Sequence, residues 1–207
     1  MATQTNQETL TVQEAIEARQ SIRKFKEEQI PRTVIDQLFK MVRLAPSAWN
    51  LQPWRYHVIT DPALKVKLQE AAYGQTQVTS APAVIVLASD MEDVLHHLPE
   101  TIHPGMTEEQ KQTEVANLSG IFNAMTVEER GQWGLTQTNI ALGFLLIAIK
   151  GLGYSSVPML GFDQAKIKEL LGISEHAKIA AMIPFGKQDS DGYPHHRFEL
   201  DRIVTFH

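Results

Sequence analysis

Two short runs of apolar, largely β-branched residues constrain the fold of this chain most strongly. APAVIVLAS begins at Ala81 and AKIAAMIPF begins at Ala177, and each run has the length of one strand. Continuous apolar runs bounded by turn residues are typical of strands that are buried on both faces. A sheet built on such strands must be covered by helices on both sides.

Helix signals are placed between the strand signals. Thr11 and Glu14 form a capping-box pattern, and a proline precedes the apolar periodicity that follows Pro31. The elements alternate without a regular strand-helix-strand rhythm, which favours an α+β fold with a helix-covered mixed sheet over a doubly wound parallel sheet. Helices are expected over residues 11–18, 31–45, 61–72, 133–151 and 163–172, and strands over residues 55–60, 81–89, 154–158, 177–185 and 202–206.

The length of 207 residues predicts one domain. Residues 1–10 have the composition of a short flexible N-terminal tail, so the domain is expected to cover residues 11–207. Within it, residues 91–130 are polar and lack a strong apolar stripe. We interpret them as a partly helical excursion that could form a lid or a specificity element.

Charge and composition exclude several classes of function. Asp and Glu number 24 against 19 Lys and Arg, which argues against nucleic acid as a partner. The chain has no cysteine, so thiolate chemistry is excluded and a reducing cytoplasm is the simplest location. The N-terminus lacks the pattern of a signal peptide. The most apolar stretch, residues 140–149, is too short to span a bilayer and is interpreted as a helix buried on most sides.

Metal and hydrolytic sites also find little support. Four of the eight histidines form the adjacent pairs His96-His97 and His195-His196, which do not point at one ligand position on a helix, and no HExxH spacing is present. Ser47 is not part of a GxSxG motif. No metal site is therefore expected.

A compact cationic cluster stands near the start of this acidic chain. In RQSIRKF, Arg19 and Arg23 are four residues apart, with Ser21 between them. Guanidinium groups and a hydroxyl match the oxygens of a phosphate. The same arginines could instead make a favourable contact with the C-terminal dipole of a helix or pair on the surface. Both readings remain open on this motif alone.

The loop APSAWNLQPW, residues 45–54, is a second candidate. Two prolines restrict its backbone, and small and amide side chains lie between them. Such a loop could offer hydrogen bonds to the edge of a planar heteroaromatic ring. It could equally be a packed connection with buried tryptophans.

Taken in order, the motifs of this chain resemble those of the FMN-dependent nitroreductase family. The resemblance covers the chain from about Glu14 to His207 and is weakest over residues 91–130. It is carried by R-x-S-x-R-x-F at 19–25, A-P-S-A-x-N-x-Q-P-W at 45–54, A-P-A-V-I-V at 81–86, W-G at 133–134, a helix ending in L-G, V-P-M-x-G-F at 157–162 and P-H-H-R at 194–197.

The resemblance implies a three-layer homodimer with FMN bound without a covalent bond at the subunit interface. Arg19 and Ser21 match positions that hold the phosphate and ribityl end, with Gln20 beside them, and Arg23 matches a basic residue at the pyrimidine edge. A loop from the other subunit lines the flavin; its matching residues are Pro46, Ser47, Ala48 and Asn50.

Further residues follow from the same resemblance. Arg197 matches a phosphate-binding arginine, and His195 stands where some relatives have lysine. Gln77 is a candidate for a polar contact to the pyrimidine ring. The segment along the O4 and N5 side of the flavin is matched by Pro158, Met159, Leu160 and Gly161, and some relatives have a glutamate where this chain has the leucine.

The reaction implied by the resemblance is ping-pong. NAD(P)H reduces FMN, and an electron-poor acceptor such as a nitroaromatic or a quinone is reduced next, so no side chain need act as a catalytic acid or base. Flavin breakdown, reductive dehalogenation and non-catalytic flavin binding on the same scaffold remain as alternatives.

Overall fold

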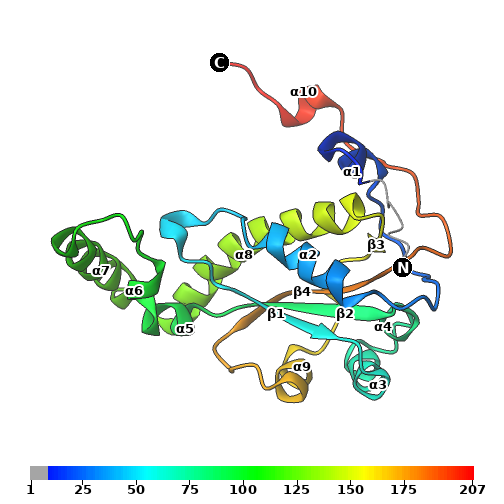
Figure 1. Ribbon diagram of the computed structural model, residues 1–207, viewed down its shortest axis with the longest axis horizontal. Coiled ribbons are helices and arrows are strands. Elements are labelled where there is room, and N and C mark those ends of the chain that lie inside the picture. Colours follow the sequence, from blue (N-terminus) through cyan, green and yellow to red (C-terminus); the bar gives the residue numbers. More distant parts are fainter. Residues whose placement is uncertain (1–8) are drawn as a thin grey trace, which may run out of the picture.

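The computed structural model describes residues 9–207, which form three layers with a sheet between two layers of helices (Figure 1). This arrangement confirms the predicted α+β class. Most of the predicted tail, residues 1–8, lies outside the described residues. At its end, the Leu10 N–H donates a hydrogen bond to the Gly151 carbonyl.

The sheet has four strands in the order β1-β2-β4-β3, and every neighbouring pair is antiparallel. A single parallel bridge, between Ser21 and Ser156, extends it beyond β3. The strands are β1 (Trp54–Ile59), β2 (Ala83–Ser89), β3 (Ser155–Ser156) and β4 (Lys178–Gly186). The two apolar runs of the sequence are therefore the two central strands.

Side chains of β2 alternate between two cores. All seven residues of the strand are buried. Val84 and Val86 belong to the core on one face, whereas Ile85 and Leu87 belong to the core on the other. This alternation is the period of two expected for a strand, and burial on both faces explains why the strand is apolar up to its last residue, Ser89.

One face of the sheet is covered by α1 (Val12–Ala18), α2 (Arg32–Val42) and α8 (Val127–Gly151) (Figure 1). A capping box between Thr126 and Glu129 begins α8 six residues before Trp133, where the sequence placed its start. The expectation that α8 is buried on most sides is wrong for the single chain. Ile140 and Phe144 are 40% and 45% exposed, because only one stripe of the helix packs on the sheet.

By length and composition alone, α8 passes the test for a membrane-spanning helix, with a mean hydropathy of 1.2 over its most apolar window. Its buried stripe nevertheless belongs to the core beside the sheet, where Ala141, Leu145 and Ile149 pack. Core helices of globular proteins have the same composition, so the packing explains the apolar stretch.

The opposite face is covered by α3 (Pro62–Ala71), α4 (Gln77–Ser80) and α9 (Gln164–Leu171) (Figure 1). Asp61 caps α3 by accepting a hydrogen bond from the Leu64 N–H, and Asp163 caps α9 in the same way. Helix α9 ends at Gly172, whose φ of 64° is the left-handed conformation that glycine adopts without strain.

Residues 91–130 extend beyond one end of the sheet (Figure 1). They are more helical than the sequence indicated and form α5 (Met91–His96), α6 (Leu98–Thr101), α7 (Glu108–Asn123) and the first turn of α8. A small core of their own holds them together, with Leu98, Leu118 and Phe122 buried in it. Their role as a lid stays a prediction, as does the division into a tail and one domain.

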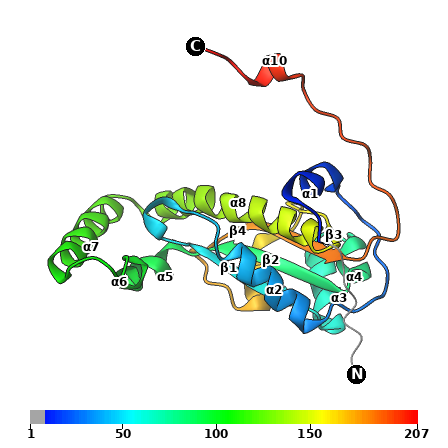
Figure 2. The ribbon, with the colours of Figure 1, turned by 45° about the horizontal axis from the view of Figure 1, so that its top comes forward.

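The predicted closing strand at residues 202–206 is wrong for the single chain. A short helix, α10 (Leu200–Ile203), occupies part of it, and the chain from residue 193 onward is exposed. This segment runs away from the body of the protein (Figure 2). Its β-branched residues Ile203, Val204 and Thr205 favour a strand, but a strand requires a hydrogen-bonded neighbour, and α10 and the residues after it have none among residues 9–207.

Candidate functional site

The cationic cluster and the P-H-H-R motif, which are separated by more than 170 residues, line one cavity. The cavity has a volume of about 210 Å³. Its lining residues are Arg19, Gln20, Ser21, Arg23, Tyr193, Pro194, His195 and Arg197. We call it the cationic cavity.

The N-terminal half of the cationic cavity is positioned by the end of α1 and by the edge of the sheet. Helix α1 ends where Arg19 takes an extended conformation. The chain then runs beside β3, with the Ile22 N–H donating to the Ser156 carbonyl at 3.1 Å. Ile22 is 2% exposed, so its side chain faces the core while the flanking Ser21 and Arg23 face the cavity.

The C-terminal half is held against α1 by polar and steric contacts. His195 Nε2 is 2.9 Å from the Glu17 carbonyl oxygen. Gly192 lies so close to Gln20 that a Cβ at this position would be 2.8 Å from the Gln20 Cβ. A glycine is therefore required for the chain to reach the cavity.

Among residues 9–207, which the structure describes, no acidic residue lines the cationic cavity. The pKa of Arg19 is lowered by burial of its guanidinium and, to a smaller extent, by the charge of Arg197. Two like charges held together without a carboxylate make an anion favourable at this place. Guanidinium forks with a serine hydroxyl match the geometry of a phosphate group.

A second predicted segment, residues 158–161, adjoins the cationic cavity through β3. Met159 exchanges two backbone hydrogen bonds with Met182 of β4, at 2.8 and 3.0 Å. After it, Leu160 and Gly161 are exposed. The structure thus brings this segment close to the N-terminal cluster, because Ser156, two residues before Pro158, bridges to Ser21.

Gln77 is connected to the same segment through another glutamine. Its Nε2 donates to Gln75 Oε1 at 2.9 Å, and Gln75 Nε2 donates to the Gly161 carbonyl at 2.7 Å. Gln77 is 8% exposed. Gln77 therefore lies beside residues 158–161, which were predicted together with it to contact the flavin.

The loop that contains Pro46, Ser47, Ala48 and Asn50 is elsewhere in the same chain. The Ala48 N–H donates to Gln137 Oε1 at 2.9 Å, which places the loop near the middle of α8. The end of α8 next to β3 lies 14 residues further on, at Gly151, or about 20 Å at 1.5 Å per residue. Within one chain, the loop does not join the cationic cavity.

The backbone of this loop has an unusual shape. Trp49, Asn50 and Gln52 have φ angles of 50°, 56° and 48°, in the left-handed region that non-glycine residues rarely adopt. The Asn50 side chain donates to the Thr101 carbonyl at 3.1 Å, and the Trp49 ring stacks on the ring of Trp133 at 5.9 Å. Contacts with α6 and α8 therefore hold the loop in this shape.

Sequence reasoning missed three residues of this region. Tyr193 and Pro194 line the cationic cavity, and they directly precede the two basic positions that were identified. Their place next to the motif was the available signal. Gln75 gave no signal, because its contact with Gly161 joins residues 86 positions apart.

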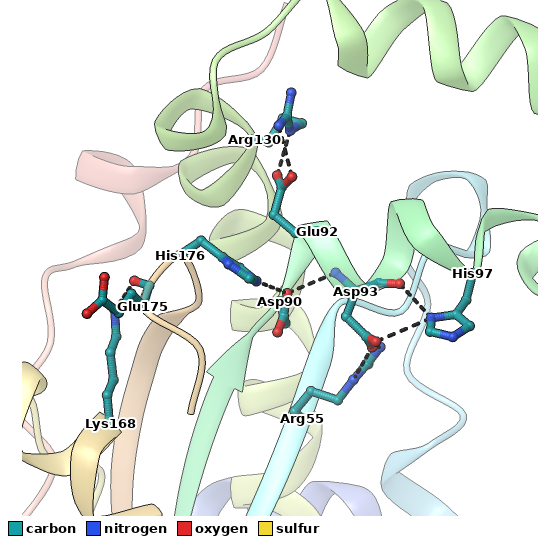
Figure 3. A network of polar contacts seen from close by, with 9 residues as sticks. All are labelled: Arg55, Asp90, Glu92, Asp93, His97, Arg130, Lys168, Glu175 and His176. Atoms are coloured by element: carbon teal, nitrogen blue, oxygen red, sulfur yellow. Dashed lines mark hydrogen bonds and ion pairs between the residues drawn. The ribbon is translucent and has the colours of Figure 1, made fainter. Parts of the chain in front are cut away.

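A different cluster of charged residues lies around α5, at the end of the sheet near the excursion (Figure 3). Arg130 forms two hydrogen bonds with the Glu92 carboxylate, at 2.6 and 2.9 Å. Arg55 binds Asp93, and His176 Nε2 is 3.0 Å from Asp90 Oδ1. We call these three pairs the paired network, since each basic group in it faces a carboxylate.

The paired network fastens the excursion to the sheet. Arg130 also donates to the carbonyls of Phe122 and Met125, so it joins α7, α8 and α5. The Arg55 guanidinium lowers the pKa of Asp93, chiefly through their hydrogen bond. Both arginines of this cluster face a carboxylate, which is typical of a structural site.

The fold and the cationic cavity together define a class: an α+β protein whose single chain contributes a cavity lined by arginines and, at a distance, an ordered loop. The nitroreductase family model matches residues 16–187. The chain belongs to the nitroreductase family.

Relatives and solved structures agree with this assignment. A Thermus thermophilus protein named NADH dehydrogenase is 43% identical over 188 residues, which are 91% of this chain and 92% of the relative. The oxygen-insensitive NADPH nitroreductase of Helicobacter pylori is 27% identical over 75% of this chain and 77% of its own length. A structure from Exiguobacterium sibiricum in complex with FMN is 24% identical, covers 98% of this chain and 100% of its own, and superposes with a TM-score of 0.87.

These comparisons identify the protein as an oxidoreductase. The 43% identity extends over nearly the whole of both chains, and the names of both relatives describe redox enzymes that use a nicotinamide nucleotide. The Exiguobacterium structure supports the fold alone.

Proposed function

We propose that this protein is an FMN-dependent NAD(P)H oxidoreductase that reduces electron-poor acceptors, such as nitroaromatics or quinones, in a ping-pong reaction. The observation that carries the proposal is the cationic cavity, in which Arg19 and Arg197 meet from the two ends of the chain. Bound FMN supplies the redox chemistry by accepting a hydride at N5 and passing it to the acceptor.

The residues of the cationic cavity fit the phosphate end of FMN. Arg19 and Arg197 supply guanidinium donors, and the Ser21 hydroxyl supplies a neutral one. Gln20 and His195 complete the polar lining. Because no carboxylate of residues 9–207 lines the cavity beside these donors, a dianionic phosphate is the ligand that the cavity favours.

The remaining predicted residues would orient the ring system. The edge is formed by Pro158, Met159, Leu160 and Gly161, and the last two of these residues are exposed and accessible to a planar ligand. Arg23 and Gln77 would meet the pyrimidine edge, where a cation stabilises negative charge on the reduced ring. None of these residues need exchange a proton.

A homodimer is part of the proposal, because one chain does not complete the site. The loop with Pro46, Ser47, Ala48 and Asn50 is about 20 Å along α8 from the cationic cavity, so it would serve the cavity of the partner subunit. Isologous pairing across a two-fold axis would bring both loops to both cavities at once.

Two surfaces support this assembly. Ile140 and Phe144 form an exposed apolar strip on α8. The projecting C-terminal segment carries further exposed apolar side chains, and a groove of about 990 Å³ lies between α2 and the open edge of β1. The end of that segment is rich in β-branched residues, which favour a strand, and a partner's edge could provide the neighbour that such a strand requires. The exposed apolar residues of the segment are Phe198, Leu200, Ile203, Val204 and Phe206.

An absorbance spectrum of the purified protein tests the proposal. We expect the bands of bound FMN, their bleaching by NADH or NADPH without oxygen, and their return when a quinone or nitroaromatic is added. A colourless protein that takes up no FMN would refute it. Loss of the flavin itself under oxygen would indicate flavin breakdown, and bound FMN that NAD(P)H does not reduce would indicate a binding protein. A cytoplasmic location stays a prediction.

The Arg19→Ala variant tests the role of the cationic cavity. We expect FMN to bind about 10- to 100-fold more weakly, the effect of losing one charge-assisted contact. Hydride transfer in the variant saturated with FMN should change much less, because the phosphate is remote from N5. Equal losses in affinity and rate would contradict the assigned role.

A further inference from the structure

We infer that Gln75 is a positioning residue that sets the orientation of both the Gly161 carbonyl and the Gln77 side chain. The inference rests on the proposed flavin site, of which both groups are part. It concerns a residue that lies outside the motifs of the sequence and joins two elements far apart in the chain. The hydrogen bonds from Gln77 to Gln75, at 2.9 Å, and from Gln75 to Gly161, at 2.7 Å, carry it.

The chemistry of these groups allows only one direction for the hydrogen bonds. A backbone carbonyl can only accept, so the Gln75 amide must turn its NH₂ group toward Gly161. Its Oε1 then faces Gln77 and must receive an N–H from it. Gln77 is thereby left with its own Oε1 and one N–H for other partners. Gly161 thus fixes the polarity of the buried Gln77 through Gln75.

The segment around Gly161 depends on this contact because its other anchors are at its ends. Met159 is fixed by two backbone bonds to Met182 on β4, and the Asp163 N–H donates to the Ala71 carbonyl at 2.8 Å. Between these anchors, Leu160 and Gly161 are exposed, and the Gly161 carbonyl is held by a side chain. Glycine permits wide rotation of its backbone, so this peptide would turn without Gln75.

Gln75 is itself held rigidly enough to act on the segment. It follows Tyr73 and Gly74, which have φ angles of 55° and 76° and form a tight turn after α3. Its backbone N–H donates to the Ala72 carbonyl at 3.2 Å, and its own carbonyl accepts from the Val78 N–H. A Cβ on Gly161 would approach Gln75 Nε2 to 3.3 Å, so the two are in close contact.

This arrangement affects the flavin end of the site. Leu160 and Gly161 belong to the edge proposed to face the O4 and N5 side, where preorganised backbone groups favour one charge state of the ring over another. Loss of Gln75 should therefore weaken FMN binding and shift the reduction potential of the bound flavin. A residue that only stabilised the fold would alter neither.

The test compares Gln75→Leu with the matched variant Gln69→Leu. Gln69 belongs to the same turn and bonds to Gly74 and Thr79, with no contact to residues 158–161 among its hydrogen bonds. For Gln75→Leu we expect the dissociation constant of FMN to rise about three- to tenfold, the loss of a neutral hydrogen bond, with a shifted midpoint potential. Gln69→Leu should match the wild type in both.

Two further measurements keep the inference falsifiable. Gln75→Glu retains an acceptor for Gln77 but sets a carboxylate against the Gly161 carbonyl, so its effect on FMN affinity should be at least as large as that of Gln75→Leu. Amide hydrogen exchange over residues 158–163 of the flavin-free protein should increase in both Gln75 variants and not in Gln69→Leu. Unchanged exchange and potential would overturn the inference. Failure of the wild type to bind FMN would instead refute the proposed function.

Discussion

The cationic cavity and the paired network use the same residue types in opposite ways. In the network, Arg130 and Arg55 each face a carboxylate, and the side chain of Arg130 is only 13% exposed. In the cavity, Arg19 faces Arg197, and the lining formed by the described part of the chain contains no carboxylate. The network compensates its charges within the chain, whereas the cavity leaves the compensation to a ligand.

This difference separates a structural site from a binding site without reference to sequence motifs. A compensated pair contributes to holding elements together, and removing one partner leaves a charge without its counterpart. Two cations without a carboxylate between them contribute little to folding and repel each other. The free energy of this repulsion is offset only when an anion binds. The two regions should therefore respond to substitution in opposite ways.

The largest effect is expected where the network is most buried. Arg130→Ala leaves Glu92 without its partner and removes the Arg130 donor from the Met125 carbonyl, while the Phe122 carbonyl keeps the Met125 N–H. We expect the free energy of unfolding to fall by about 2–4 kcal/mol, or roughly 5–15 °C in Tm for a domain of this size. Thermal unfolding monitored by circular dichroism measures it. FMN affinity should stay within a factor of two, and a large loss of affinity would break the comparison.

The next effect concerns the cavity. Arg197→Ala should raise the dissociation constant of FMN about 10- to 100-fold, while the Tm of the flavin-free protein stays the same or rises slightly because a like charge next to Arg19 is removed. Fluorescence titration with FMN measures the affinity. Lys24→Ala is the matched control, since Lys24 pairs with Asp189 at 3.2 Å close to the cavity, and its loss should leave affinity unchanged. A drop in apo stability for Arg197→Ala would show that the cavity is structural.

The smallest effect depends on pH. The hydrogen bond from Arg55 lowers the pKa of Asp93 below its usual value. The pair therefore stabilises the folded protein fully above about pH 4, which is the pKa of this carboxyl in the unfolded chain. This stabilisation is lost as the pH falls further. Arg55→Met should reduce stability at pH 7 by at most about 1 kcal/mol, since the pair is partly exposed. The difference from the wild type should shrink below pH 4, and a difference that grows there would contradict this account. Urea unfolding between pH 3 and 7 measures it.

The fold was predictable where the signal is local. The continuous apolar run of β2 and the periodic stripe of α2 each reveal an element within one stretch of sequence. The strand expected at residues 202–206 was wrong because β-branched residues specify a strand only together with a neighbouring strand. Burial of α8 was overestimated because an apolar helix face can pack in the core of its own chain or against a partner. A single sequence does not distinguish these two cases.

The candidate site likewise has residues that local motifs predict and residues that only the structure identifies. The residues of the cationic cavity were found because Arg19 and Ser21 belong to one motif and Arg197 to another, each identifiable in a few letters. That these motifs share one cavity in a single chain, while Asn50 is remote from it, needed the structure. Gln75 was not predictable, since a glutamine in a polar turn is ordinary until its distant partner is known.

The left-handed loop at Trp49 has a consequence for how a complete site would be assembled. Trp49 and Gln52 adopt conformations that cost non-glycine residues roughly 1 kcal/mol each, and bonds to Gln137 and Thr101 hold the loop there before any second molecule arrives. The free-energy cost of these left-handed conformations is thus already met when the monomer folds. A docking partner meets a rigid surface, so little entropy is lost on contact, and the association rate is governed by collision and orientation.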